Sequence, residues 1–76
     1  MARYFFHIQD GLRLIDSEGV ELPDRAAAEQ LALVTAGGML RDIGRDMRQR
    51  SEWSMQVVDE QGALICRLHY TATREL

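Results

Sequence analysis

Apolar and polar residues alternate along four segments of the chain, and this alternation predicts β-strands. The first segment places Tyr4, Phe6 and Ile8 on one side and Phe5, His7 and Gln9 on the other. Residues 12–16, 53–59 and 63–70 alternate in a similar way. Asp10-Gly11 joins the first two segments, and the turn at residues 59–62 joins the last two. The pattern therefore predicts two β-hairpins.

Between the hairpins, apolar residues recur at the three- and four-residue spacing of a helix. Pro23 keeps the preceding residue extended, and Asp24 supplies a carboxylate that caps the helix start. We expect the helix to fray near Gly44 or to end by Gln49. The stripe expected to pack on the sheet contains Ala28, Ala32, Ala36, Met39, Leu40, Ile43 and Met47. A second stripe contains Ala27, Leu31, Val34 and Gly38.

The predicted element order is ββαββ, with residues 20–22 as an extended approach to the helix. The simplest architecture for this order is α+β: a single, mainly antiparallel four-stranded sheet with one long helix packed on one face. We expect one domain over residues 1–76, ordered from about 3 to 70, with residues 71–76 as a tail.

One helix covers one face of a sheet, so the outer face must meet water or another molecule. Alternation directs Phe6, Leu64, Cys66 and Leu68 toward the helix. It directs Phe5, His7, Ile15, Val58, Ile65 and His69 outward, with Arg3, Arg13, Gln56 and Arg67 among them. Exposed apolar groups rimmed by charge are typical of contact surfaces. We therefore predict a protein interface either on this face or on the second helix stripe.

Chain length makes self-association the expected supplement to stability. A 76-residue domain buries only roughly 60% of the surface of its unfolded chain. The single cysteine, Cys66, excludes an intramolecular disulfide and is typical of a reducing, cytoplasmic compartment. The chain has no apolar run long enough to span a membrane, and its net charge of −3 opposes broad contact with nucleic acid. We accordingly predict a cytoplasmic homodimer.

Candidate catalytic and metal-binding groups are sparse. Cys66 and His69 stand three apart on a strand, so they face opposite ways and form neither a metal site nor a nucleophile pair. His7 and His69 share the outer face. If their strands are neighbours, they form a pH-sensitive pair; otherwise they are two separate polar residues. We predict no catalytic residue, no cofactor and no metal.

Two further features admit a structural and a functional interpretation. Four carboxylates, Asp16, Glu18, Glu21 and Asp24, precede the helix, where they favour its N-terminal dipole. Their spacing lacks the pattern of a calcium loop. Gly37-Gly38 interrupts the helix, either as tolerated strain or as a point of close backbone approach.

The segments "RYFFHIQDG", "LIDSEGVELPD" and "VVDEQGALICRLHY", with Trp53, resemble a family of small uncharacterised bacterial domains common in rhizobia and other alphaproteobacteria. The resemblance covers nearly the whole chain and lies in the combination of motifs. It implies no activity and no catalytic or binding residues. The function expected is a small interaction or structural module. The alternative is a regulatory module that binds an acidic or single-stranded nucleic-acid partner through the outer face.

Overall fold

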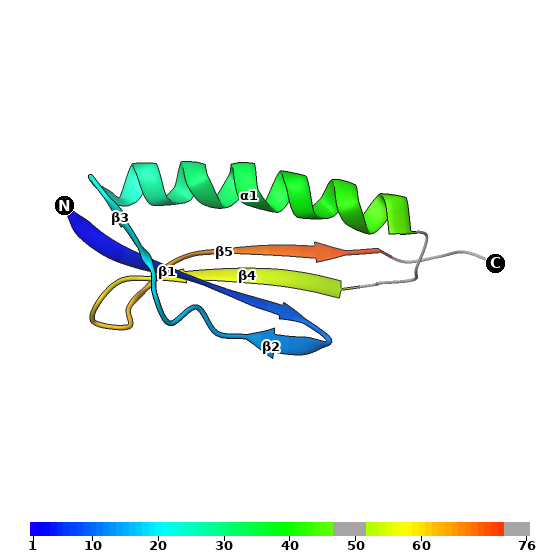
Figure 1. Cartoon of the computed structure of the whole chain (residues 1–76), viewed down its shortest axis with the longest axis horizontal. Helices are drawn as coiled ribbons and strands as arrows, with labels where there is room; N and C mark the ends of the chain where they lie inside the picture. Colours follow the sequence, from blue (N-terminus) through cyan, green and yellow to red (C-terminus); the bar gives the residue numbers. More distant parts are fainter. Residues whose placement is uncertain (47–51, 73–76) are drawn as a thin grey trace.

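The structure is a computed structural model that describes residues 1–46 and 52–72. These residues form a helix layer on a sheet layer (Figure 1). In chain order the elements are β1 (Ala2–Asp10), β2 (Leu12–Leu14), β3 (Val20–Leu22), α1 (Arg25–Asp46), β4 (Glu52–Val58) and β5 (Leu64–Thr71). The predicted α+β class and mainly antiparallel sheet are confirmed. Within the described ranges the sheet has five strands, because the extended segment before the helix pairs as β3.

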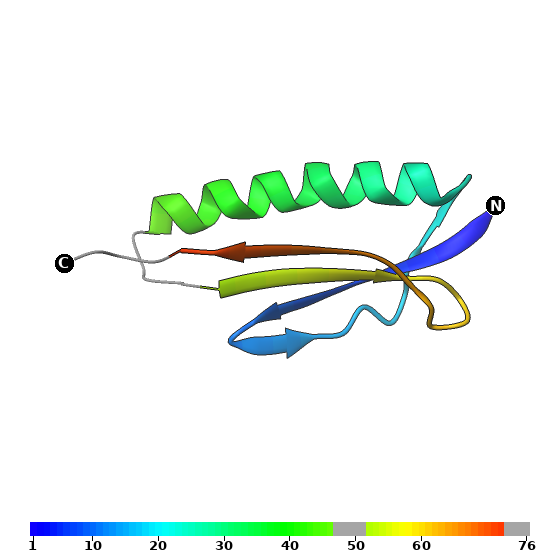
Figure 2. The same cartoon turned by 180° about the vertical axis from the view of Figure 1, so that it is seen from behind.

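The sheet is organised around β1 and β4, which pair with each other. β5 pairs with the far edge of β4, while β2 and β3 both pair with the far edge of β1. β3 pairs with residues 2–4 of β1, and β2 pairs with residues 8–10. Among the described strands, none therefore lies beside residues 5–7 of β1 on that edge. The view from behind shows the connection between β2 and β3 passing this gap (Figure 2).

The helix begins where the sequence predicts. The backbone amide of Ala27 donates a 2.9 Å hydrogen bond to Oδ1 of Asp24, which is the expected N-cap contact. Ala28 and Ala32 are fully buried and Ala36 nearly so, since small side chains allow the helix backbone to approach the sheet closely. Met39 packs on the same core. The side chain of Ile43 and all of Met47 lie outside the described residues.

The core of the described part of the chain is small. In the described part of the chain, its buried members are Tyr4, Ala28, Ala32, Ala36, Trp53, Met55 and Val57. Three of these seven are alanines, so most of the buried apolar volume comes from four strand residues. Phe6 and Leu68 are partly buried against this cluster, as alternation predicts.

One irregularity in the last hairpin corrects two predicted side-chain directions. The register between β4 and β5 shifts at Val57/Val58, so Val57 pairs with Cys66 but Val58 pairs with Leu64. The extra residue, Ile65, packs partly buried against the core, and Leu64 is 52% exposed. The expectation that Leu64 faces the helix and Ile65 faces outward was therefore wrong, because a β-bulge breaks the two-residue alternation.

The glycine pair in the helix has no packing role within the described chain. A β-carbon added to Gly37 or Gly38 would find no side chain or distant backbone within 4 Å. Close backbone approach at these glycines is thus not seen among the described residues. We expect Gly37→Ala to raise the free energy of unfolding by about 0.5–1 kcal/mol, because alanine restricts the unfolded chain and favours helix. Urea unfolding followed by circular dichroism tests this, and a destabilised variant would contradict it.

Candidate functional site

The outer face carries three rows of side chains that cross the sheet. Strand register gives the rows Phe5–Val58–Leu64, His7–Gln56–Arg67 and Arg13–Gln9–Ser54–His69. Of the residues predicted to lie here, Phe5, His7, Val58, Arg67 and His69 do so. Ile15 follows the end of β2 and is 58% exposed. The outer face is thus apolar at one end and polar through its middle.

The apolar end of the outer face is partly covered by the chain itself. Gly19 passes so close that a β-carbon there would lie 2.9 Å from Cε2 of Phe5 and 2.9 Å from the carbonyl oxygen of Tyr4. Gly19 also has a φ of 73°, in the left-handed region that suits glycine. Phe5 is consequently half-buried rather than freely exposed.

Asp16 closes the gap in strand pairing beside β1. Its Oδ2 accepts a 3.1 Å hydrogen bond from the amide of Phe6, in the stretch of β1 between the two short strands. Its Oδ1 accepts bonds from the amides of Glu18 and Gly19, at 3.1 and 3.0 Å. One carboxylate therefore satisfies three backbone donors and ties the β2–β3 connection to β1.

Hydrogen bonding also lowers the pKa of Asp16. Burial by itself would raise the pKa of Asp16, but the amides of Gly19, Phe6 and Glu18 outweigh it and hold that pKa below its ordinary value. The amide of Asp16 donates a 3.1 Å bond to Nδ1 of His7. Nδ1 is thus an acceptor, so the proton of neutral His7 resides on Nε2.

The two histidines are separate. β4 lies between their strands, so the condition for a pH-sensitive pair is not met. His69 instead has its Nε2 3.5 Å from Oε1 of Glu52, an exposed contact. Cys66 lies half-buried under the helix in register with Val57. Burial, with a smaller contribution from Glu29, raises the pKa of the Cys66 thiol against the effect of Arg25, which favours the protonated form.

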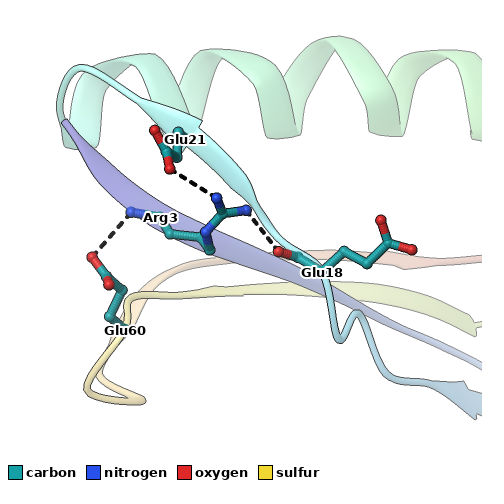
Figure 3. A network of polar contacts seen from close by, with 4 residues as sticks. All are labelled: Arg3, Glu18, Glu21 and Glu60. Atoms are coloured by element: carbon teal, nitrogen blue, oxygen red, sulfur yellow. Dashed lines mark hydrogen bonds and ion pairs between the residues drawn. The ribbon is translucent and has the colours of Figure 1, made fainter.

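The acidic segment before the helix serves structure. Arg3 on β1 donates from Nη2 to Oε1 of Glu21 and from Nη1 to the carbonyl oxygen of Glu18, both at 2.8 Å (Figure 3). The amide of Arg3 donates a 3.2 Å bond to Oε1 of Glu60 in the β4–β5 turn. This exposed network links three segments. Residues 1–46 and 52–72 contain no group of three or more His, Cys, Asp or Glu arranged to hold a metal ion.

Exposed apolar side chains gather on β2, where the sequence had placed no apolar interface candidate. Leu12 and Leu14 are 75% and 58% exposed. Their register with Asp10 and Ile8 puts them on the helix side of the sheet. The helix, however, packs over β4, β5 and β3, and β2 lies on the far side of β1 (Figure 1). We call Leu12 and Leu14 the β2 surface; alternation alone would have assigned it to the core.

The polar middle of the outer face contains a shallow cup. It is lined by His7, Ile8, Gln9, Arg13, Ser54 and Gln56. The lining combines a guanidinium, a hydroxyl, two amides and an imidazole, and it includes no carboxylate. The second helix stripe offers a different surface: Val34 is 69% exposed, whereas Ala27, Leu31 and Gly38 are half-buried.

Comparison with known protein families gives a match over most of the chain. The model of a family described as "Domain of unknown function (DUF6894)" matches residues 3–71. No curated protein and no solved structure matches the chain. Among the described residues, no helix is both long and apolar enough to cross a membrane.

Proposed function

We propose that this chain, which belongs to the DUF6894 family of domains of unknown function, is a protein-interaction module that forms a homodimer through its β2 surface. One observation carries the proposal. Leu12 and Leu14 are each more than half exposed on a strand that the chain's own helix does not cover. Two large apolar side chains adjacent on one face favour burial against another molecule.

The small core supports a second copy as the partner. Three of the seven buried residues are alanines, and the lone Cys66 provides no internal disulfide. Domains of this size commonly gain stability from association. Contact between identical surfaces around a two-fold axis requires self-complementarity, which leucine against leucine satisfies. Arg13 lies on the opposite face from the two leucines, so the contact does not bury its charge.

Leu14→Arg is expected to convert a dimer into a monomer, because it places a charge in the proposed contact. Light scattering coupled to size exclusion, at high micromolar concentration, would show the mass fall from twice the 8.7 kDa chain mass to that of one chain. Leu64→Arg is the matched control. Leu64 is a strand leucine of similar exposure, 52%, but lies on the outer face, and its variant is expected to remain dimeric.

Val34→Arg distinguishes the second helix stripe from the β2 surface. Val34 is the most exposed member of that stripe, at 69%. If the Val34→Arg variant is monomeric and the Leu14→Arg variant is dimeric, the interface lies on the helix. A monomeric wild-type chain would refute self-association altogether. The cytoplasmic location expected from the lone cysteine stays a prediction, which fractionation of the source cells tests.

A further inference from the structure

We propose that the cup on the outer face binds a carboxylate group presented by an acidic segment of a partner protein. This interaction is separate from the homodimer, because the β2 surface lies on the helix side of the sheet and the cup on the outer side. One molecule can therefore use both surfaces at once. The cup is lined by His7, Ile8, Gln9, Arg13, Ser54 and Gln56.

The lining of the cup supplies several hydrogen-bond donors. Arg13 offers a guanidinium whose planar fork matches a carboxylate, and Ser54 offers a hydroxyl. The amide of Asp16 occupies Nδ1 of His7, which leaves Nε2–H of the neutral ring as a donor. The side-chain amides of Gln9 and Gln56 contribute further N–H groups. The lining therefore favours an acceptor-rich group.

The cup also differs in charge from the rest of the chain. The chain as a whole carries a net charge of −3, yet the cup contains Arg13 and no carboxylate. Arg67 continues the row beyond Gln56. Two acidic groups near the cup are engaged: Asp16 accepts three backbone amides on the Nδ1 side of His7, and Glu52, which lines a neighbouring pocket with Gln9 and Ser54, lies beside His69. A locally cationic surface on an acidic protein complements a negatively charged partner.

The surroundings favour an acidic peptide over nucleic acid. Single-stranded nucleic acid is bound largely by stacking of bases on exposed aromatic rings. Phe5 is the aromatic residue that strand register places on this face in the described sheet, and Gly19 partly covers its ring. The net negative charge of the chain also opposes a phosphate backbone, which carries a charge at every nucleotide.

Titration of the full chain with a fluorescent hexaglutamate peptide, with hexaglutamine as the uncharged control, tests the proposal. At low ionic strength we expect saturable binding of hexaglutamate alone. Arg13→Gln is expected to weaken it about tenfold, the effect of losing one charge-assisted contact. The His7 imidazole resonances should shift along the same binding curve in NMR spectra.

Arg25→Gln on the helix is the matched control, because it removes the same charge from an exposed position outside the cup. We expect it to change the affinity less than twofold. Equal losses in Arg13→Gln and Arg25→Gln would show diffuse charge attraction and overturn the proposal, as would the absence of saturable binding. Tighter, Arg13-dependent binding of an oligothymidylate or of inorganic phosphate would also overturn it, by assigning the cup to phosphate. None of these outcomes bears on the mass measurement that tests the homodimer.

Discussion

Gly19→Ala is expected to lower the free energy of unfolding by about 3 kcal/mol, one of the two largest effects we predict. A left-handed φ of 73° costs an alanine about 1–2 kcal/mol by itself. The new methyl would in addition lie 2.9 Å from the carbonyl oxygen of Tyr4, a backbone atom that cannot turn aside. The β2–β3 connection must then move away from β1. Urea unfolding monitored by Trp53 fluorescence measures the loss.

Gly62→Ala separates the two causes. Gly62 has a similar φ, 82°, in the β4–β5 turn, but a β-carbon there meets nothing within 4 Å. This variant should therefore lose only the conformational part, about 1–2 kcal/mol. Equal losses at Gly19 and Gly62 would show that the close approach to β1 contributes nothing.

Asp16→Ala is also expected to have a large effect: it should lower the free energy of unfolding by about 2 kcal/mol. The substitution removes the acceptor of three backbone amides, and the amide of Phe6 is partly buried in a stretch of β1 that has no strand beside it. Asp59→Ala is the matched control. Asp59 accepts hydrogen bonds from two backbone amides at 2.9 Å within an exposed turn, so this substitution should lower the free energy of unfolding by about 1 kcal/mol. A larger loss at Asp59 would contradict the bridging role of Asp16.

The pH dependence of stability gives an independent test of Asp16. Its pKa in the folded protein is lowered from 3.8 because the amide bonds outweigh the cost of burial. A carboxylate with a lowered folded pKa stabilises the fold above its unfolded pKa, and this contribution is lost as the pH falls through the folded pKa. The difference in free energy of unfolding between the wild-type chain and Asp16→Asn should therefore be constant near neutral pH and shrink below about pH 4. A gap that is unchanged at pH 2.5 would refute the ionic contribution.

These two positions also bear on the proposed interfaces. Gly19 and Asp16 hold the connection between β2 and β3, and β2 carries both the β2 surface and Arg13 of the cup. Loosening of this connection is expected to disturb dimerisation and carboxylate binding together. The interface variants Leu14→Arg and Arg13→Gln should in contrast disturb one property each. A shared loss in a single-interface variant would indicate damage to the fold rather than to a contact.

Local sequence patterns determined the elements of this protein and most of their directions. Alternation assigned Phe6 to the core side and Phe5 to the outer side, and Asp24 marked the helix start. These predictions succeed because the pleat of a strand and the orphan amides of a helix end depend on neighbouring residues only. The same patterns gave no indication that Leu12 and Leu14 lie beyond the reach of the helix.

The tertiary structure alone decided which strands are neighbours and where the helix lies. Placing β4 between β1 and β5 separates His7 from His69, and the bulge at Ile65 exchanges the directions of that residue and Leu64. Strand order and register arise from contacts between residues far apart in the chain. One extra residue in a strand reverses the side-chain directions that alternation assigns between the bulge and the next turn. The sequence of this protein therefore determines its strands and helix, whereas its exposed surfaces follow from long-range packing.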